Sequence, residues 1–335
     1  MRMNKLMKFL TNKLTLIGLT LVWMASPMVA QTAEKTSKSA HKTMHFQQVK
    51  YKAASRKINA KIRTKSPVIY QDHYDGSGPL QLASSKALIY NQLTGEVVYG
   101  KNADIITPIA SVTKLMTAMV MLDAHLPMDQ LLFISEEDID YLKGTSSRLS
   151  VGTSLTRGEF LQLALMASEN RAASALGRNY PGGIRAFVRA MNYKAQSLGM
   201  TSSYFVDSSG LDSSNTSTAE DLVKMVSAAY EYPEIRQVST TPSQEITLYG
   251  RTNPLSFVNT NSLVRGSDWV IGLSKTGFIN EAGRCLVMQA EVAGQPMIIV
   301  LLDSSGKQTR IGDANRVRKW LERHEYNVFA GNVNG

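Results

Sequence analysis

The most informative segment of this chain is Ile109-Ala-Ser-Val-Thr-Lys-Leu-Met-Thr-Ala118. Apolar residues continue beyond it to Leu122 at helical spacing, so we expect a buried helix that begins at Ser111. Lys114 lies one turn after Ser111 and therefore on the same face. The Ser111 backbone N–H has no helical partner at this position, and the positive end of the helix favours a developing negative charge. The segment therefore predicts a serine with a nearby lysine and an oxyanion donor.

The spacing Ser-x-x-Lys alone carries little information. It occurs three times, as Ser39–Lys42, Ser111–Lys114 and Ser304–Lys307. Matches of this kind arise by chance at these serine and lysine frequencies, so their context decides. The first lies in a polar segment and the third in a turn after a strand. Only the second opens an apolar helix, which makes Ser111 the candidate nucleophile.

Two further short motifs lie in contexts that hold them in place. Ser168-Glu169-Asn170 follows an apolar stretch, 161–167, whereas a second Ser-x-Asn match, 213–215, lies in a polar loop. Lys275-Thr276-Gly277 occurs once, and we expect it to end a strand over 270–274. Its glycine permits close backbone approach, and a strand edge can pair with an extended peptide.

The rest of the chain predicts a mixture of helices and strands. A hairpin comes first, helices occupy the middle, and strands and a last helix follow, which predicts an α+β fold. An antiparallel sheet is then completed by both ends of the chain. The expected elements are a hairpin over 87–100, helices over 158–177, 182–198 and 217–230 (the last opened by a capping box, Ser217 to Glu220), strands near 268–275, 284–292 and 297–303, and a helix over 309–323.

Composition and charge exclude several classes of protein. The chain has 335 residues, of which 43% are hydrophobic and 19% charged, so it is neither wholly disordered nor a small disulfide scaffold. The net charge of +10 is concentrated at the start: four basic residues lie in 1–30, and ten lie in 31–65 against the single acid Glu34. The remaining 66–335 hold 23 basic and 26 acidic residues. A nucleic-acid enzyme is expected to be basic on its folded surface, so we predict no nucleic-acid partner.

Residues 1–30 have the order of a secretory signal peptide. Basic residues as far as Lys13 precede an apolar run, 14–24, and small residues lead to Ala30. The run spans roughly 17 Å, shorter than the ~30 Å hydrocarbon core, so cleavage near Ala30 is preferred to a retained anchor. Because Cys285 is the only cysteine, no internal disulfide forms, and export without disulfides favours a bacterial periplasm. Cys285 itself is expected to be a core residue of a strand.

Residues 31–80 are predicted to form a basic, disordered tail or linker, and 81–335 to form the catalytic domain. The positive charge of 31–65 predicts a weak, salt-dependent contact with an anionic membrane or wall polymer, with a solvated tail as the alternative. His41 and His45 lack a third ligand, so we predict no metal site.

Taken in order, the three motifs at Ser111, Ser168 and Lys275 resemble the superfamily of serine D-Ala-D-Ala peptidases and class A β-lactamases. Phe205-Val-Asp-Ser-Ser-Gly-Leu211 adds to the resemblance, which covers about 80–323. Ser168-Glu-Asn-Arg-Ala-Ala173 is most similar to the D,D-endopeptidase branch, the type-7 penicillin-binding proteins. The resemblance implies a β-lactamase/transpeptidase-like fold, with an antiparallel sheet flanked by helices and an all-helical lobe, and chemistry without cofactor or metal.

The resemblance also implies roles for individual residues. Ser111 is the expected nucleophile and Lys114 its base, which requires the lysine pKa to fall by about three units through burial and repulsion from Lys275. The remaining roles are a proton relay at Ser168, a hydrogen bond to the substrate amide from Asn170, carboxylate binding by Lys275, Thr276 and Gly277, and a second oxyanion N–H at Phe278.

The implied activity is cleavage of D-alanyl cross-links in peptidoglycan, with β-lactams as covalent inhibitors and other wall enzymes as further partners. The alternatives are a D-alanyl-D-alanine carboxypeptidase and a non-hydrolytic penicillin sensor or wall-binding module. A class A β-lactamase is disfavoured because no Glu-x-x-Leu-Asn segment lies between the second and third motifs. A transpeptidase is expected to be larger, although the acceptor, water or amine, is not legible in these residues.

Overall fold

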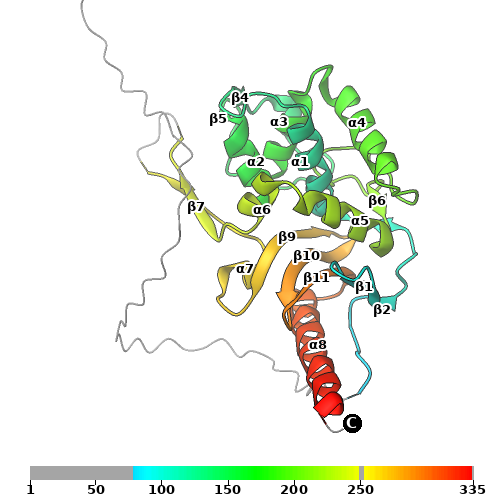
Figure 1. The fold of residues 1–335 in the computed structure, drawn as a ribbon. Coiled ribbons are helices and arrows are strands. Elements are labelled where there is room, and N and C mark those ends of the chain that lie inside the picture. Colours follow the sequence, from blue (N-terminus) through cyan, green and yellow to red (C-terminus); the bar gives the residue numbers. More distant parts are fainter. Residues whose placement is uncertain (1–77, 249–252, 334–335) are drawn as a thin grey trace, which may run out of the picture. The chain divides into compact units, whose positions relative to one another are not determined.

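The structure is a computed structural model that describes residues 78–248 and 253–333, with side chains described as far as Arg323. The predicted signal peptide, the histidine pair and all but the last residues of the predicted tail lie outside the described residues. Within them the chain alternates strands and helices in the order of the predicted α+β fold, which is thereby confirmed (Figure 1).

The described residues contain a five-stranded antiparallel sheet in the order β2-β1-β11-β10-β9. Both ends of the chain contribute, since β1 pairs with β11, as the sequence predicted. In the described residues β9 pairs only with β10, so β9 is an edge strand. The strand bounds are β1 Lys86–Asn91, β2 Val97–Lys101, β9 Val270–Ile279, β10 Gly283–Val292 and β11 Gln295–Ser304.

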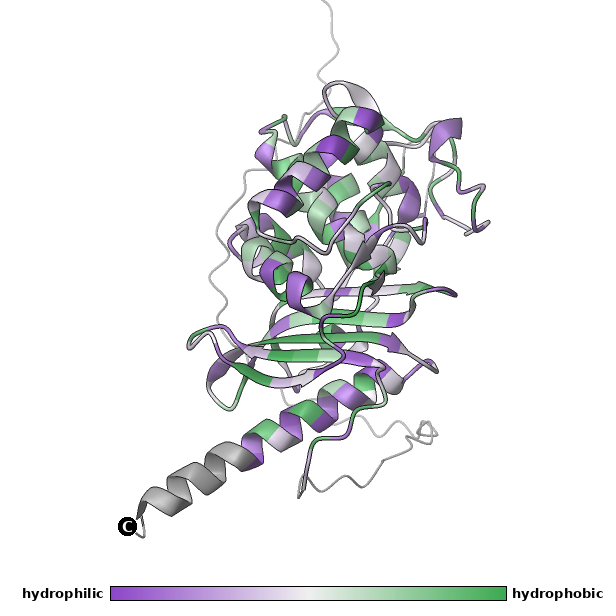
Figure 2. Ribbon diagram, turned by 90° about the vertical axis from the view of Figure 1, so that its right-hand side faces the viewer, coloured by the Kyte–Doolittle hydropathy of each residue, from purple (hydrophilic) through white to green (hydrophobic). Residues whose placement is uncertain are grey.

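Both faces of the sheet are covered, which explains the almost continuous apolar sequence of β10 and β11. One face packs against helices of the lobe, and the other packs against α8, Thr309–Val333 (Figure 2). Cys285 points into the first of these cores, and burial raises the pKa of its thiol to about 11. The thiol is therefore un-ionised at neutral pH and behaves as a core residue.

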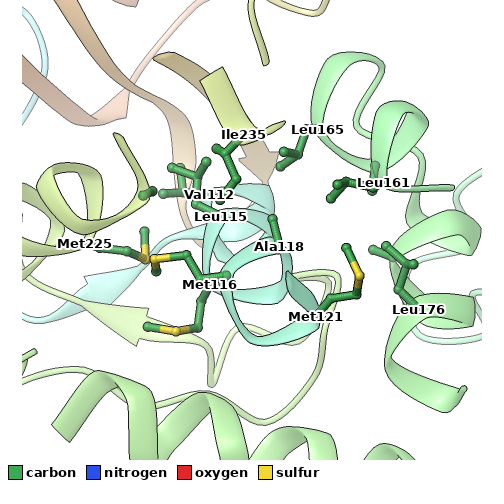
Figure 3. Close-up of a cluster of buried hydrophobic side chains, with 14 of the residues drawn as sticks. Val112, Leu115, Met116, Ala118, Met121, Leu161, Leu165, Leu176, Met225 and Ile235 are labelled. Atoms are coloured by element: carbon green, nitrogen blue, oxygen red, sulfur yellow. The ribbon is translucent and has the colours of Figure 1, made fainter. Parts of the chain in front are cut away.

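The helical lobe is built around α1, Lys114–Asp123, whose residues from 114 to 121 are all buried. Figure 3 shows its Leu115, Met116 and Met121 among side chains of the surrounding helices. A helix that is apolar on every side has to lie at the centre of a bundle. Its neighbours are α2 Arg157–Met166, α3 Asn170–Arg178, α4 Gly183–Ser197, α5 Ala219–Tyr230 and α6 Pro233–Ser239.

Short elements connect these parts. In the described part of the chain they are the 3₁₀ helices η1 Ala110–Thr113 and η2 Glu136–Asp138, the helix α7 Ser262–Arg265, and three two-stranded pairings: β3 Thr107–Pro108 with β6 Thr216–Ser217, β4 Leu131–Phe133 with β5 Ser154–Thr156, and β7 Ser243–Ile246 with β8 Leu255–Val258. None of the helices in residues 78–248 and 253–333 combines the length and apolar character needed to span a bilayer.

Two predicted helices differ from the structure. The helix expected over 158–177 is two helices, because Ser168 adopts a left-handed conformation with φ of 59° that ends α2 and re-aims the chain into α3. The helix expected to begin at Ser111 starts with a 3₁₀ turn, and its α-helical part begins at Lys114.

Three predicted boundaries are also wrong. The cap of α5 is Thr218, whose side chain accepts from the Asp221 backbone N–H, rather than Ser217. β9 does not end at Lys275 but continues to Ile279, because pairing with β10 extends through this segment. The last helix begins at Thr309 as expected and runs further than predicted, to Val333.

Gly210 holds the loop between α4 and β6 against η1. Its φ is +80°, and a Cβ atom at this position would lie 1.9 Å from the Ala110 carbonyl oxygen. No side chain fits there, so the contact between the loop and η1 requires glycine.

We expect Gly210→Ala to lower the free energy of unfolding by about 3 kcal/mol or more, since left-handed strain and overpacking add. Gly294→Ala is the matched control, because Gly294 has a φ of +73° but a Cβ atom added to it would meet no other atom within 4 Å. It should cost only about 1 kcal/mol, the strain alone. Urea unfolding of both variants provides the measurement, and equal midpoints would contradict the close contact.

Candidate functional site

Ser111 and Lys114 lie at the junction of η1 and α1, where the chain enters the centre of the lobe. The Lys114 Nζ atom donates to three oxygens: Ser111 Oγ at 2.7 Å, Asn170 Oδ1 at 2.7 Å and the Ser209 carbonyl at 2.6 Å. The lysine side chain is completely buried, whereas Ser111 is partly accessible. A partly accessible hydroxyl, that of Ser111, is thus hydrogen-bonded to the buried amine of Lys114.

The three oxygens around Lys114 are not equivalent. An amide oxygen and a backbone carbonyl only accept hydrogen bonds, whereas a hydroxyl also donates. When Lys114 is neutral, its lone pair therefore finds a donor only in Ser111 among these three partners. The geometry directs the basic lone pair of the amine at the Ser111 proton.

Burial lowers the pKa of Lys114 from its ordinary value of 10.5 to about 7, and the charges of Asp207 and Glu169 oppose this fall. The lowering is of the size that base catalysis near neutral pH requires. Burial also lowers the pKa of Lys275, helped by repulsion from Lys114 and Arg310. Repulsion between the two lysines therefore lowers the pKa of Lys275. The pKa of Lys114 is lowered by burial and not by the expected repulsion from Lys275.

Ser168 connects the second lysine to the site. Lys275 Nζ donates to Ser168 Oγ at 2.8 Å and to the Thr276 carbonyl at 2.8 Å, and its side chain is buried. The left-handed turn at Ser168 between α2 and α3 is what brings this hydroxyl to the strand. A hydroxyl that accepts from a cation remains free to pass its own proton onward.

Asn170 contacts both Lys114 and a neighbouring loop. Its Oδ1 accepts from Lys114, and its Nδ2 donates to Thr145 Oγ1 at 3.0 Å. The sequence predicted only a bond from Asn170 to the substrate. In the structure Asn170 links Lys114 to the loop that carries Thr145.

The strand β9 approaches η1 closely at Gly277. A Cβ atom there would lie 3.1 Å from the Ser111 backbone nitrogen and 3.0 Å from the Ile109 carbonyl. The glycine is therefore what allows the strand to approach the backbone of Ser111 so closely. Phe278 follows directly in the strand and is 49% exposed. Thr276 Oγ1 is 2.7 Å from Thr260 Oγ1, a neighbour that the sequence did not suggest.

Asp207 organises the loop that contacts Lys114, a role that the sequence did not assign to it. Its carboxylate accepts from the backbone N–H groups of Ser209, Gly210 and Asp212, at 2.6, 2.6 and 2.8 Å. These bonds fold the loop that presents the Ser209 carbonyl to Lys114. The pattern Asp-Ser-Ser-Gly is a turn signature, and that signal was available in the sequence.

Arg310 is a second residue that the sequence did not single out. Its Nη1 donates to the carbonyls of Gly277 and Cys285, at 2.9 and 3.2 Å, and so supports β9 from the side of α8. No local motif marks it. Across residues 78–248 and 253–333, no group of three or more His, Cys, Asp and Glu side chains is placed to bind a metal ion.

Comparisons with known proteins agree with this geometry. Residues 73–306 match the model of the peptidase S11 family, described as D-alanyl-D-alanine carboxypeptidase. The chain is 49% identical to a D-alanyl-D-alanine endopeptidase of Pseudomonas aeruginosa over 246 residues, 73% of this chain and 79% of the relative. It is 46% identical to a D-alanyl-D-alanine endopeptidase of Escherichia coli, over 72% of this chain and 78% of the relative.

Solved structures show the same fold. The DD-transpeptidase of Streptomyces K15 superposes with a TM-score of 0.67 at 29% identity, covering 72% of this chain and 97% of the other. Penicillin-binding protein D2 of Listeria monocytogenes, in its ampicillin-bound form, gives 0.62 at 31% identity, over 71% and 97%. The predicted β-lactamase/transpeptidase-like fold is thereby confirmed. With its family match covering well over half of its length, the chain belongs to the serine D-alanyl-D-alanine peptidases of family S11.

Proposed function

We propose that this protein is a peptidoglycan D,D-endopeptidase that cleaves the bond between D-alanine and a diaminoacyl side chain through an acyl-enzyme on Ser111. The observation that carries the chemistry is the 2.7 Å contact of a buried lysine, with a pKa near 7, to a partly accessible serine. The names of the two relatives above 45% identity favour the endopeptidase branch.

The reaction proceeds in two balanced steps. The Ser111 proton moves to Lys114 Nζ while Oγ attacks the D-alanyl carbonyl carbon. The backbone N–H groups of Ser111 and Phe278 hold the oxyanion, the C–N bond breaks, and Lys114 passes its proton through Ser168 to the leaving amine. Water then attacks the ester carbonyl and gives one proton to Lys114. The bond from the carbonyl carbon to Ser111 Oγ breaks, the D-alanyl acid is released, and Lys114 passes the proton to Ser111 Oγ.

Lys275, Thr276 and Gly277 form the proposed recognition site for the substrate carboxylate. Lys275 is buried, with a pKa lowered by burial and by Lys114 and Arg310. An incoming carboxylate favours the charged ammonium, so binding raises the pKa of Lys275 again. Charge on Lys275 in turn disfavours charge on Lys114 and so promotes its function as a base.

Two alternative functions were weighed against the endopeptidase. The first alternative is a D-alanyl-D-alanine carboxypeptidase, which is the family's description; it would use the same residues in the same roles. A non-hydrolytic penicillin sensor is disfavoured by the intact pair of Ser111 and Lys114.

We further propose export to the periplasm by residues 1–30, a catalytic domain over 81–335, stable β-lactam adducts, and weak contacts of 31–65 with anionic wall or membrane.

The nucleophile is tested by labelling. We expect fluorescent penicillin to label the protein covalently and Ser111→Ala to lose the label entirely, because the ester oxygen is gone. Ser39→Ala, at another Ser-x-x-Lys match, is the control and should label normally. Persistent labelling of Ser111→Ala, measured on a denaturing gel, would assign the ester to another residue.

The base is tested by pH. Since Lys114 acts only when neutral, the second-order rate of penicillin acylation should fall about tenfold per pH unit below about pH 6 and level off above about 8. Lys114→Arg should be inactive throughout, because a guanidinium stays charged in this range. Stopped-flow acylation that is independent of pH between 5 and 8 would exclude Lys114 as the base.

The substrate class is tested with purified residues 31–335 and its Ser111→Ala variant, each incubated with cross-linked tetrapeptide dimers and with pentapeptide monomers. We expect dimers to be converted to monomers by the first and not by the second, as measured by chromatography and mass. Release of D-alanine from pentapeptides with dimers untouched would make the protein a carboxypeptidase. Penicillin labelling without any hydrolysis would favour the sensor.

A further inference from the structure

A chain of hydrogen bonds leads from the Lys114 amine to a carboxylate on a neighbouring loop. Lys114 Nζ donates to Asn170 Oδ1 at 2.7 Å, and Asn170 Nδ2 donates to Thr145 Oγ1 at 3.0 Å. The Thr145 hydroxyl in turn donates to Asp140 Oδ2 at 2.6 Å. The sequence marked neither Thr145 nor Asp140 as a site residue, and neither takes part in the reaction steps above.

Asp140 fixes the direction of the hydroxyl bond. An ionised carboxylate can only accept hydrogen bonds, so the proton between Asp140 and Thr145 has to come from the hydroxyl. Burial opposes the charge of Asp140, but hydrogen bonds from the Thr145 side chain and from backbone N–H groups outweigh it and lower the pKa of the carboxyl. Asp140 is therefore ionised at neutral pH, and the Thr145 hydroxyl donates its single proton to it.

The direction of this bond decides the orientation of the Asn170 amide. With its proton donated to Asp140, the Thr145 oxygen can only accept, so the end of the amide that faces it has to be the NH₂ group. The other end, the carbonyl oxygen, is thereby turned toward Lys114. Because the amide nitrogen carries two hydrogens, its bond to Thr145 leaves one of them for the substrate.

The orientation of the amide matters because Lys114 acts as a base through its lone pair. In the observed orientation Asn170 offers Lys114 an oxygen, which only accepts hydrogen bonds. A reversed amide would present its N–H groups to the neutral amine and would donate to that lone pair. The lone pair would then no longer be free for the proton of Ser111, which lies 2.7 Å away.

The loop that carries Thr145 is held in place by contacts other than the bond to Asn170. Asp140 accepts from three backbone N–H groups within 142–145, at 2.8 to 2.9 Å. Lys143 forms an ion pair with Glu281, which lies in the turn between β9 and β10. The position of the Thr145 oxygen is thus set by the loop, so it can act as a fixed acceptor for the amide.

We propose that Thr145 is a positioning residue for the base. Its hydroxyl, held by Asp140, orients the Asn170 amide. The lone pair of Lys114 therefore stays free to take the proton of Ser111. The proposal rests on the proposed function, since it needs Lys114 to act as the base, and it adds the contacts that keep this base available.

The test is the rate of penicillin acylation as a function of pH in Thr145→Val, which keeps the shape of the side chain and removes the hydroxyl. Thr145 is exposed, so the variant should fold normally. We expect the rate at the plateau above about pH 8 to fall about tenfold, because a reversed amide occupies the lone pair. A donor to the neutral amine also stabilises it, so the pKa of Lys114 should fall and the decline in rate should move to lower pH. The variant keeps the other charged groups that interact with Lys114, which are Asp207, Glu169 and Lys275.

Three further variants separate this role from a general disturbance of the loop. Thr145→Ser restores the hydroxyl and should rescue both the rate and the pH profile. Ser146→Ala removes the exposed hydroxyl of the next residue and is the matched control, with the rate and profile of the unmodified protein. In an Asn170→Ala background, Thr145→Val should have no additional effect, because Thr145 acts only through the amide.

Asp140→Ala should show the same two changes as Thr145→Val, since the hydroxyl is then free to donate to Asn170. A rate and pH profile of Thr145→Val equal to those of the unmodified protein would overturn the proposal. So would a decline in rate that moves to higher pH, because water entering a loosened site stabilises the ammonium and raises the pKa of Lys114. Failure of the proposed function looks different: the unmodified protein is then not labelled by penicillin, or its acylation does not depend on pH.

Discussion

The arrangement of the site depends on the burial of the Lys114 amine. Lys114 is completely enclosed at the start of a helix that is itself buried on every side, and its pKa near 7 is the consequence. Burying a charge is costly unless hydrogen bonds compensate, and three oxygens from three separate segments do so here. Hydrogen bonds to Lys114 therefore help to position the elements that carry Ser111, Asn170 and Ser209. Burial of Lys114 among these elements in turn lowers its pKa.

Close backbone approach is the second constraint. Gly210 brings one loop onto Ala110, and Gly277 brings β9 onto the nitrogen of Ser111. Ser111 is thus held between two segments that are far apart in sequence, and the glycine in each has no Cβ atom to prevent the close contact. Asp207 and Arg310 stabilise these segments from behind, through bonds to backbone groups. Contacts between backbone groups therefore fix the position of Ser111.

Much of this arrangement was legible in the sequence because its signals are local. The apolar periodicity of the sequence predicted the helix after Ser111 and the strand around Lys275. The order of such elements predicted the fold class. The break at Ser168 was missed because a left-handed serine has no local signature and depends on its partner Lys275. Arg310 was missed because its role lies in contacts with strands 25 to 33 residues away. The one-residue error at Thr218 reflects two adjacent residues that are equally good caps.

The pairing of β1 with β11 has a consequence for how the chain acquires its structure. Lys86 lies opposite Leu302. The β1–β2 hairpin is therefore synthesised long before β11, the strand with which β1 pairs. Until β11 is synthesised, β1 has an unsatisfied edge, and the helices of the lobe lack the surface on which they pack. Such long-range pairing makes folding slow and cooperative, because a large loop must close before the contacts form. A chain shortened before β11 therefore loses more than its last strand: the first hairpin, over two hundred residues earlier, is left without its partner.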